Sequence, residues 1–238
     1  MFKIKKFVAI ILVAVIALLP CSNAFANDVV KTATFNGITY KILESYDSNG
    51  SKVVTVTGNG ETNIVVNDGV NITITKIKKD KTQSTIQKEI KYETEPSLAA
   101  ISSTGSLYTT FWNYSYYWSD NSFNSSGIWW SLSSGNTYGS AAHFDNRDLT
   151  ARDYAERFMA DVNDIQNQQV GAIAALGFAA ASAIAAALTA ETGIGGVVGI
   201  VLALGGTIGS AGFWVSAYTS SVSANYNFSQ FKNVLRIY

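Results

Sequence analysis

Residues 170–218 read VGAIAALGFAAASAIAAALTAETGIGGVVGIVLALGGTIGSAGFWVSAY, and this stretch decides the fold. Its only formally charged side chain is Glu191, which divides it into two arms. Val170–Ala190 is 21 uncharged residues rich in alanine, and Gly195–Tyr218 is a second uncharged run rich in glycine and branched aliphatic residues. In a helix, 21 residues extend roughly 31 Å, which matches a bilayer core of about 30 Å. The pattern predicts an antiparallel hairpin of two apolar helices, each long enough to span a membrane.

Small residues favour close packing of these helices. Four glycines stand at GxxxG spacing, Gly195 with Gly199 and Gly205 with Gly209, and this spacing is typical of helix pairs in lipid. We expect them to act in membrane insertion together with Glu191 and Trp214. Carrying ionised Glu191 into lipid is disfavoured by at least about 2.5–3.5 kcal/mol, so protonation would lower the barrier. Glu191 equally fits an ordinary hydrophilic turn residue.

Two other interpretations of the apolar arms stay open. Helices that are apolar on every face also form the centre of soluble proteins, provided that the rest of the chain wraps around them. Permanent residence in a membrane is the second alternative, but alanine contributes little to insertion. Arms of marginal hydrophobicity suit a protein that is first soluble and enters lipid later.

A more polar helix is predicted just before the arms. Thr150-Ala151-Arg152-Asp153 fits a helix capping box, in which the Thr hydroxyl accepts from a free backbone N–H. One face of the following helix carries mainly apolar residues at helical spacing, and the other faces carry charge. The spaced residues are Tyr154, Phe158, Val162, Ile165 and Gln169.

Residues 96–145 form an aromatic-rich region with a predicted β-hairpin. Aromatic residues occupy even positions, which places them on one face of an extended strand. They are Tyr108, Trp112, Tyr114, Tyr116 and Trp118, and Ile128, Trp130 and Leu132 repeat the pattern beyond a polar loop at Ser119–Gly127. This face either covers the core, anchors at a bilayer interface or stacks on sugars. Trp112, Trp118, Trp129 and Trp130 are the candidate interfacial anchors.

The region before Pro96 is predicted to be an antiparallel meander, either a stable domain or a removable pro-segment, over residues 27–95. Turn signals separate runs rich in Val, Ile and Thr. The runs are Gly37–Tyr46, Lys52–Thr57, Thr62–Val66 and Asn71–Lys78, and a basic stretch from Lys76 to Lys81 indicates a solvated linker or edge strand. The predicted fold class is therefore α+β, with a β-rich N-terminal half and a helical region at 146–238 that contains the apolar hairpin 170–218.

Residues 1–26 read as a signal peptide that directs the protein out of the cell. Lys3, Lys5 and Lys6 precede an uncharged run, and Ala24-Phe25-Ala26 fits a cleavage site, so the mature chain would begin at Asn27. An uncleaved anchor is the alternative. The mature chain would carry a formal charge of about −3, which argues against a nucleic-acid partner. It would also lack Cys21, the only cysteine, so no disulfide would stabilise it.

Catalytic chemistry finds little support. His143 is the only histidine, and no nucleophile elbow, HExxH or phosphate loop occurs. A Ser-His-Asp arrangement around His143 and Asp145 would require a geometry that neighbouring positions do not establish. One imidazole without thiolates makes a poor transition-metal site. We therefore expect no enzyme activity, no catalytic residues, no cofactor and no metal.

The order of these segments resembles a known family. A signal peptide, a β-rich half, a Trp/Tyr segment, the helix DYAERFMADVNDIQNQQVGAIAALGFAAA (residues 153–181) and a Gly/Ala hairpin are similar in layout to the large non-lantibiotic geobacillin family of secreted bacteriocins. The resemblance is best over Asp153–Tyr218. It implies an antibacterial protein that acts on related bacteria, with the target bacterial membrane and an immunity protein as partners. The hairpin also looks like that of pore-forming colicins in physical design.

Two functions follow from these observations. The first is a secreted antibacterial toxin that inserts the apolar hairpin into the target membrane. The second is a secreted module that binds cell-wall glycan through its Tyr/Trp face, with the hairpin only a buried core.

Overall fold

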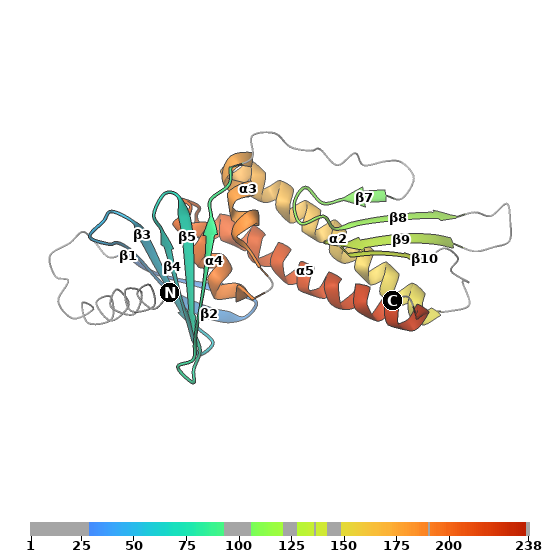
Figure 1. The fold of residues 1–238 in the computed structure, drawn as a ribbon, viewed down its shortest axis with the longest axis horizontal. Helices are drawn as coiled ribbons and strands as arrows, with labels where there is room; N and C mark the ends of the chain where they lie inside the picture. Colours follow the sequence, from blue (N-terminus) through green and yellow to red (C-terminus); the bar gives the residue numbers. More distant parts are fainter. Residues whose placement is uncertain are drawn as a thin grey trace, which may run out of the picture.

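The computed structural model describes residues 29–92, 106–120, 128–135, 137–141, 149–189 and 191–236. Within these residues, two antiparallel sheets are followed along the chain by four helices, so the fold is α+β as the sequence predicts (Figure 1). The expected signal peptide at 1–26, the expected boundary at Pro96 and the histidine His143 lie outside the described residues.

Sheet A is a six-stranded meander in which each strand pairs with the next along the chain. Two of its hairpins use Asn-Gly turns, Asn36-Gly37 and Asn59-Gly60, and all four residues have positive φ. Such turns match the twist of the flanking strands. The strands are β1 (Val29–Phe35), β2 (Ile38–Tyr46), β3 (Lys52–Gly58), β4 (Glu61–Asn67), β5 (Asn71–Ile77) and β6 (Gln83–Glu89).

The four strands predicted in this region are β2 to β5, and the meander is confirmed. The prediction did not single out β1 or β6. The basic stretch begins at Lys76 near the end of β5 and continues through the turn to β6, which is an edge strand. Its sequence QSTIQKE has one aliphatic residue, Ile86, and is mostly exposed, so hydrophobic alternation carries almost no signal there.

Sheet B and two long helices form the other end of the molecule (Figure 1). Its strands are β7 (Ser106–Tyr108), β8 (Ser115–Asp120), β9 (Ile128–Ser134) and β10 (Thr137–Ala141), in the order β10-β9-β8-β7. The pairing of β8 with β9, in which Trp118 lies opposite Trp130, confirms the predicted hairpin across the polar loop.

The long helices α2 (Leu149–Leu176) and α5 (Ile208–Leu235) pack side by side in opposite directions. Asp161 Oδ2 on α2 accepts hydrogen bonds from Ser223 Oγ (2.9 Å) and Asn227 Nδ2 (2.7 Å) on α5, and Asp164 accepts one from Ser220. Four of the five positions predicted to face the core, Phe158, Val162, Ile165 and Gln169, are fully buried. The predicted amphipathic helix is therefore confirmed.

The prediction of two uninterrupted arms of membrane length is wrong. Gly177 (φ 79°) separates α2 from α3 (Phe178–Ala187), and Gly205 (φ 89°) follows α4 (Gly193–Ala203). Gly205 N–H donates to Leu202 and Gly206 N–H to Val201, which closes α4 with a Schellman motif. In the described part of the chain, none of the helices has both the length and the apolarity needed to cross a membrane. Counting uncharged residues overlooked the helix-terminating role of these glycines.

The prediction that the even-numbered aromatic residues share one strand face is also wrong. The chain reverses between β7 and β8, where Trp112 (φ 71°) and Asn113 (φ 53°) take the left-handed conformation of a tight turn. Tyr108 and Trp112 therefore do not lie on the same strand as Tyr116. Tyr108 is 57 % exposed, whereas Tyr114 is buried.

The glycines of the first GxxxG pair pack on a sheet, not on another helix. A Cβ added at Gly195 would lie 2.5 Å from Asn63 Nδ2, and one added at Gly199 would lie 2.6 Å from Val65 Cγ2, both on β4. At Gly205 nothing lies within 4 Å of an added Cβ. The expectation of glycine-mediated packing between the two arms is therefore corrected to close packing of helix on sheet.

Substituting Gly199 tests this contact. We expect Gly199→Ala to lower the free energy of unfolding by about 1–3 kcal/mol relative to Gly212→Ala, measured by urea denaturation. Gly212 is the matched control because it lies inside α5 with nothing within 4 Å of an added Cβ. Both changes gain a similar helix propensity, about 1 kcal/mol, so their difference isolates the overlap with Val65. Equal stabilities would contradict the close packing.

Candidate functional site

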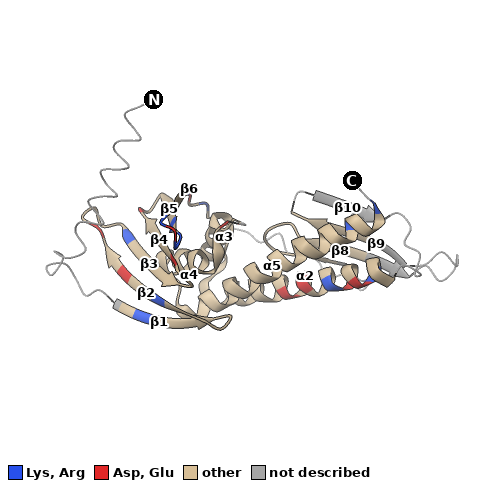
Figure 2. Ribbon diagram, turned by 90° about the horizontal axis from the view of Figure 1, so that it is seen from below, with Lys and Arg blue, Asp and Glu red and all other residues tan. Residues whose placement is uncertain are grey.

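Helix α4 is the most deeply buried helix and carries no charged or strongly polar side chain. It lies on β3, β4 and β5 of sheet A and is covered on other sides by α5 and α3. The sheet residues beneath it include Val54, Val56, Val65, Ile72 and Ile74, each at most 3 % exposed. Figure 2 shows charged residues on the strands of sheet A and on α2, whereas α4 is free of them. Sheet A is therefore an apolar shelter for α4.

Two side chains at the strand ends hold the C-terminal end of α4. Lys52 Nζ donates to the carbonyl of Leu202 at 2.5 Å, and Asn67 Nδ2 donates to that of Ala203 at 2.9 Å. The last carbonyls of a helix have no partner within the helix, and a cation there also opposes the negative end of its dipole. Lys52 and Asn67 are adjacent partners on β3 and β4, so one corner of the sheet caps the helix.

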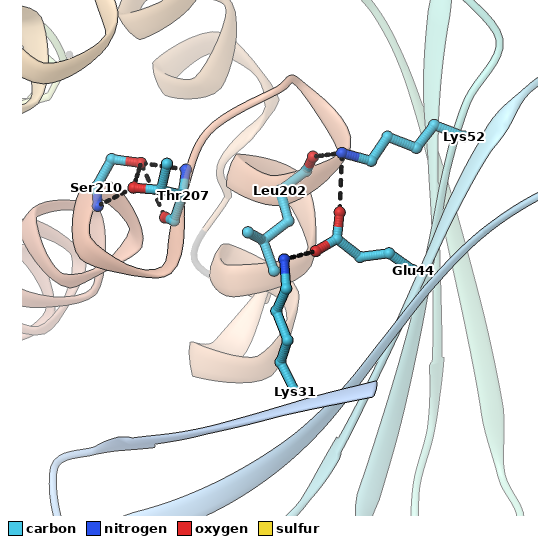
Figure 3. A network of polar contacts seen from close by, with 6 residues as sticks. All are labelled: Lys31, Glu44, Lys52, Leu202, Thr207 and Ser210. Atoms are coloured by element: carbon cyan, nitrogen blue, oxygen red, sulfur yellow. Dashed lines mark hydrogen bonds and ion pairs between the residues drawn. The ribbon is translucent and has the colours of Figure 1, made fainter. Parts of the chain in front are cut away.

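An ion pair positions Lys52 (Figure 3). Glu44 on β2 lies between two lysines, with its Oε2 3.0 Å from Lys52 Nζ and its Oε1 2.8 Å from Lys31 Nζ. Burial by itself raises the pKa of Glu44, but the hydrogen bonds and charges of Lys31 and Lys52 outweigh it and hold that pKa below its ordinary value. We call Lys31, Glu44, Lys52 and Asn67 the polar latch of α4.

Beyond the latch, the chain turns sharply into α5. Thr207 and Ser210 form a reciprocal capping box, in which Ser210 N donates to Thr207 Oγ1 at 3.1 Å and Thr207 N donates to Ser210 Oγ at 2.8 Å (Figure 3). Because α4 ends in its own glycine motif and α5 begins with its own cap, the two helices are separate units joined at Gly205-Gly206.

The N-terminal end of α4 follows the turn that carries Glu191, and the Glu191 side chain is exposed. Thr189 and Thr192 close the turn, with Thr189 N donating to Thr192 Oγ1 at 2.9 Å. Gly193 N donates to Tyr218 Oη at 3.1 Å, which ties the start of α4 to α5. The predicted membrane-insertion residues therefore do not share one environment. Gly195 and Gly199 are buried against sheet A, whereas Glu191 and Gly209 are exposed at the protein surface.

Among the tryptophans predicted to act at a membrane, the structure describes the side chains of Trp112 and Trp214. Trp214 is fully buried, and its ring lies 5.6 Å from that of Trp112 and 5.9 Å from that of Phe111. In the folded chain Trp214 therefore packs in the core, which is the role expected if it is not an interfacial anchor. Trp112 is half-buried, and its Nε1 donates to the Ala185 carbonyl of α3 at 3.0 Å. The side chains of Trp118, Trp129 and Trp130 lie outside the described part of the structure.

A cleft of about 320 Å³ lies beside Trp112, between the β7–β8 turn, the α3–α4 turn and α5. Its ten lining residues carry no charge. Sequence patterns had not identified Asn113, Thr189, Tyr218 or Asn225, which come together here from three distant segments. No spacing rule could have found them, because the tertiary fold alone makes them neighbours.

In the described ranges, no three His, Cys, Asp or Glu side chains form a group that could hold a metal ion.

The polar latch predicts a pH dependence of stability. A carboxylate whose folded pKa is lowered stabilises the fold above its ordinary pKa, here 4.5, and this stabilisation is lost as the pH falls through the lower folded value. We expect Glu44→Gln to lose about 1.5–3 kcal/mol of unfolding free energy at pH 7, because hydrogen bonds to a charged group are removed. In urea unfolding at a series of pH values, the gap between variant and wild type should close in acid. A gap that stays constant would exclude the latch.

Comparisons with known proteins find no matching family model, no matching curated protein and no matching solved structure.

Proposed function

We propose that this protein is a secreted antibacterial toxin that damages the target bacterial membrane by releasing α4 and its neighbouring apolar segments from sheet A. The observation that carries the proposal is the shelter itself. An uncharged helix lies against a valine-rich sheet face, has a glycine with positive φ at each end, and is held to the sheet at its C-terminal end by polar contacts from two side chains.

The glycines give α4 the freedom that release requires. Gly193 (φ 67°) and Gly205 (φ 89°) flank it, and both backbone conformations are easily exchanged for others in glycine. In lipid, where every backbone group must be paired within its own segment, a continuous helix becomes the favoured state. Residues 193–218 contain no charge and would extend roughly 39 Å as one helix, longer than a bilayer core of about 30 Å.

The latch is suited to exchange at a membrane surface. Lys52 donates to the C-terminal end of α4, and Lys31 pairs with Glu44, the carboxylate that positions Lys52. Anionic lipid headgroups attract such lysines by about 1 kcal/mol each. Asn63 Oδ1 adds a cost to the sheltered state, since it is buried under α4 without a hydrogen-bond partner among the described residues. Such an orphan acceptor costs about 1–3 kcal/mol.

The antibacterial target rests on the resemblance to the secreted geobacillin family, which also supports export from the cell and an immunity protein in the producer. The alternative is a secreted module in which α4 is only a permanent core. Only the toxin function requires α4 to leave sheet A, so an experiment that detects this release distinguishes the two functions.

A disulfide between α4 and β4 tests release directly. A Cβ at position 199 would lie 3.4 Å from the Cβ of Val65, close to the 3.5–4.5 Å of native disulfides. We therefore expect Val65→Cys/Gly199→Cys, in a chain with Cys21→Ser, to lock α4 when oxidised. Dye-loaded vesicles of anionic phospholipid should remain intact with the oxidised protein and leak after a reductant is added.

The matched control is a disulfide that leaves α4 unbound. Val53 and Val66 lie opposite each other on β3 and β4, on the face of sheet A away from α4, and opposed residues are close enough for a cross-strand disulfide. Val53→Cys/Val66→Cys should leak dye in both redox states. If the protein without cysteines leaves vesicles intact, or if the oxidised lock leaks as fast as the reduced one, the toxin mechanism is wrong.

The exposed turn provides an independent prediction. If the α3–α4 turn crosses the bilayer, removing its charge should speed insertion, because an ionised carboxylate costs at least about 2.5–3.5 kcal/mol there. We expect Glu191→Gln to increase the initial rate of dye release at pH 7, with a smaller difference in acid. Equal rates for both proteins across the pH range would remove Glu191 from the mechanism.

A further inference from the structure

We propose that the cleft beside Trp112 binds a neutral N-acetylated sugar unit of a glycan. This site lies away from the contact between α4 and sheet A, and the inference does not depend on the toxin function. The cleft has about 320 Å³, within the range of small-molecule sites, and is built from segments that are far apart in the sequence.

The first observation is a strained aromatic residue at the wall of the cleft. Trp112 has φ 71° and its neighbour Asn113 has φ 53°. Positive φ is tolerated by asparagine but is an outlier for a residue as bulky as tryptophan. Conformations of this kind persist where the surrounding structure enforces them, and they concentrate at ligand sites.

The surrounding structure does enforce this turn. Gln169 of α2 is fully buried, and its amide accepts from Phe111 N at 2.9 Å and donates to Phe111 O at 3.3 Å. Thr109 Oγ1 bridges the turn by accepting from Tyr114 N at 3.0 Å and donating to Phe111 O at 2.6 Å. The turn is thus clamped before any ligand arrives, so binding would order few side chains.

The second observation is the chemistry of the lining. It combines aromatic rings with the amides of Asn113 and Asn225 and includes no charged side chain. An ionic ligand would find no counter-charge, and a purely apolar ligand would leave the amides unpaired. Sugars have hydroxyl groups around an apolar ring face, so aromatic and amide side chains together complement them.

Two features favour an N-acetyl group. Leu188 and Val222 add an aliphatic patch from the α3–α4 turn and from α5, which suits the acetyl methyl group. Beside Val222 on α5, Asn225 Oδ1 accepts a hydrogen bond from Ser134, which orients that amide. Burial raises the pKa of Tyr114, so its hydroxyl stays neutral at physiological pH. The cleft therefore has fixed neutral hydrogen-bonding groups beside an apolar patch.

Isothermal titration calorimetry of the full chain with the soluble trisaccharide of N-acetylglucosamine tests the proposal. We expect saturable binding that Asn113→Gly weakens roughly tenfold, since that change removes one amide, while glycine keeps the left-handed backbone without strain. Val222→Glu, which places a charge in the neutral cleft, should weaken binding at least as much. Val222 is 50 % exposed, so the fold should tolerate the change.

Ser229→Glu is the matched control, because Ser229 is exposed two turns further along α5 and does not line the cleft. It should bind the trisaccharide as the wild type does. Pull-down with insoluble peptidoglycan extends the test to the polymer, and the same two variants should be lost from the pellet. Absence of saturable trisaccharide binding, or binding equal in all variants, would overturn the proposal. The dye-release assay uses vesicles that contain no sugar, so it tests the toxin function independently of glycan binding. Failure of one function therefore does not imply failure of the other.

Discussion

The close packing of α4 on sheet A is the contact on which the rest of the structure depends. Gly195 and Gly199 remove the side chains that would hold the helix away from β4, so the backbone of α4 approaches the valines beneath it. A helix that is apolar on every face has to be covered on every face. Helices α3 and α5 cover the sides that the sheet leaves open, and this requirement connects the N-terminal half of the chain to the C-terminal half.

The same burial disfavours unpaired backbone carbonyls at the C-terminal end of α4. Its last carbonyls lie near an apolar core, where an unpaired backbone group is costly. Lys52 and Asn67 pair with two of them, and Glu44 holds Lys52 in place. The apolar contact therefore supplies most of the burial, while a few charged and amide groups at the rim control how the helix ends. Charged contacts respond to pH, salt and anionic surfaces, whereas the valine contacts do not.

Trp112 connects the two ends of the molecule. Its ring contacts Trp214 in the core under sheet A, and the same turn is clamped to α2 beside sheet B through Gln169. The cleft next to Trp112 includes Leu188 and Thr189, which belong to the turn that leads into α4. A ligand in the cleft and the start of the sheltered helix would therefore contact the same few residues.

The sequence by itself determined the types of element. Alternating Val, Ile and Thr predicted β2 to β5, and the spacing of Phe158, Val162, Ile165 and Gln169 predicted the buried face of α2, because local periodicity reflects which side is buried. Only the tertiary structure decided which distant residues become neighbours. Gly199 faces a sheet, and Asn113 lines the same cleft as Tyr218. These outcomes depend on contacts between distant segments, and the residues next to each position in the sequence do not indicate those contacts.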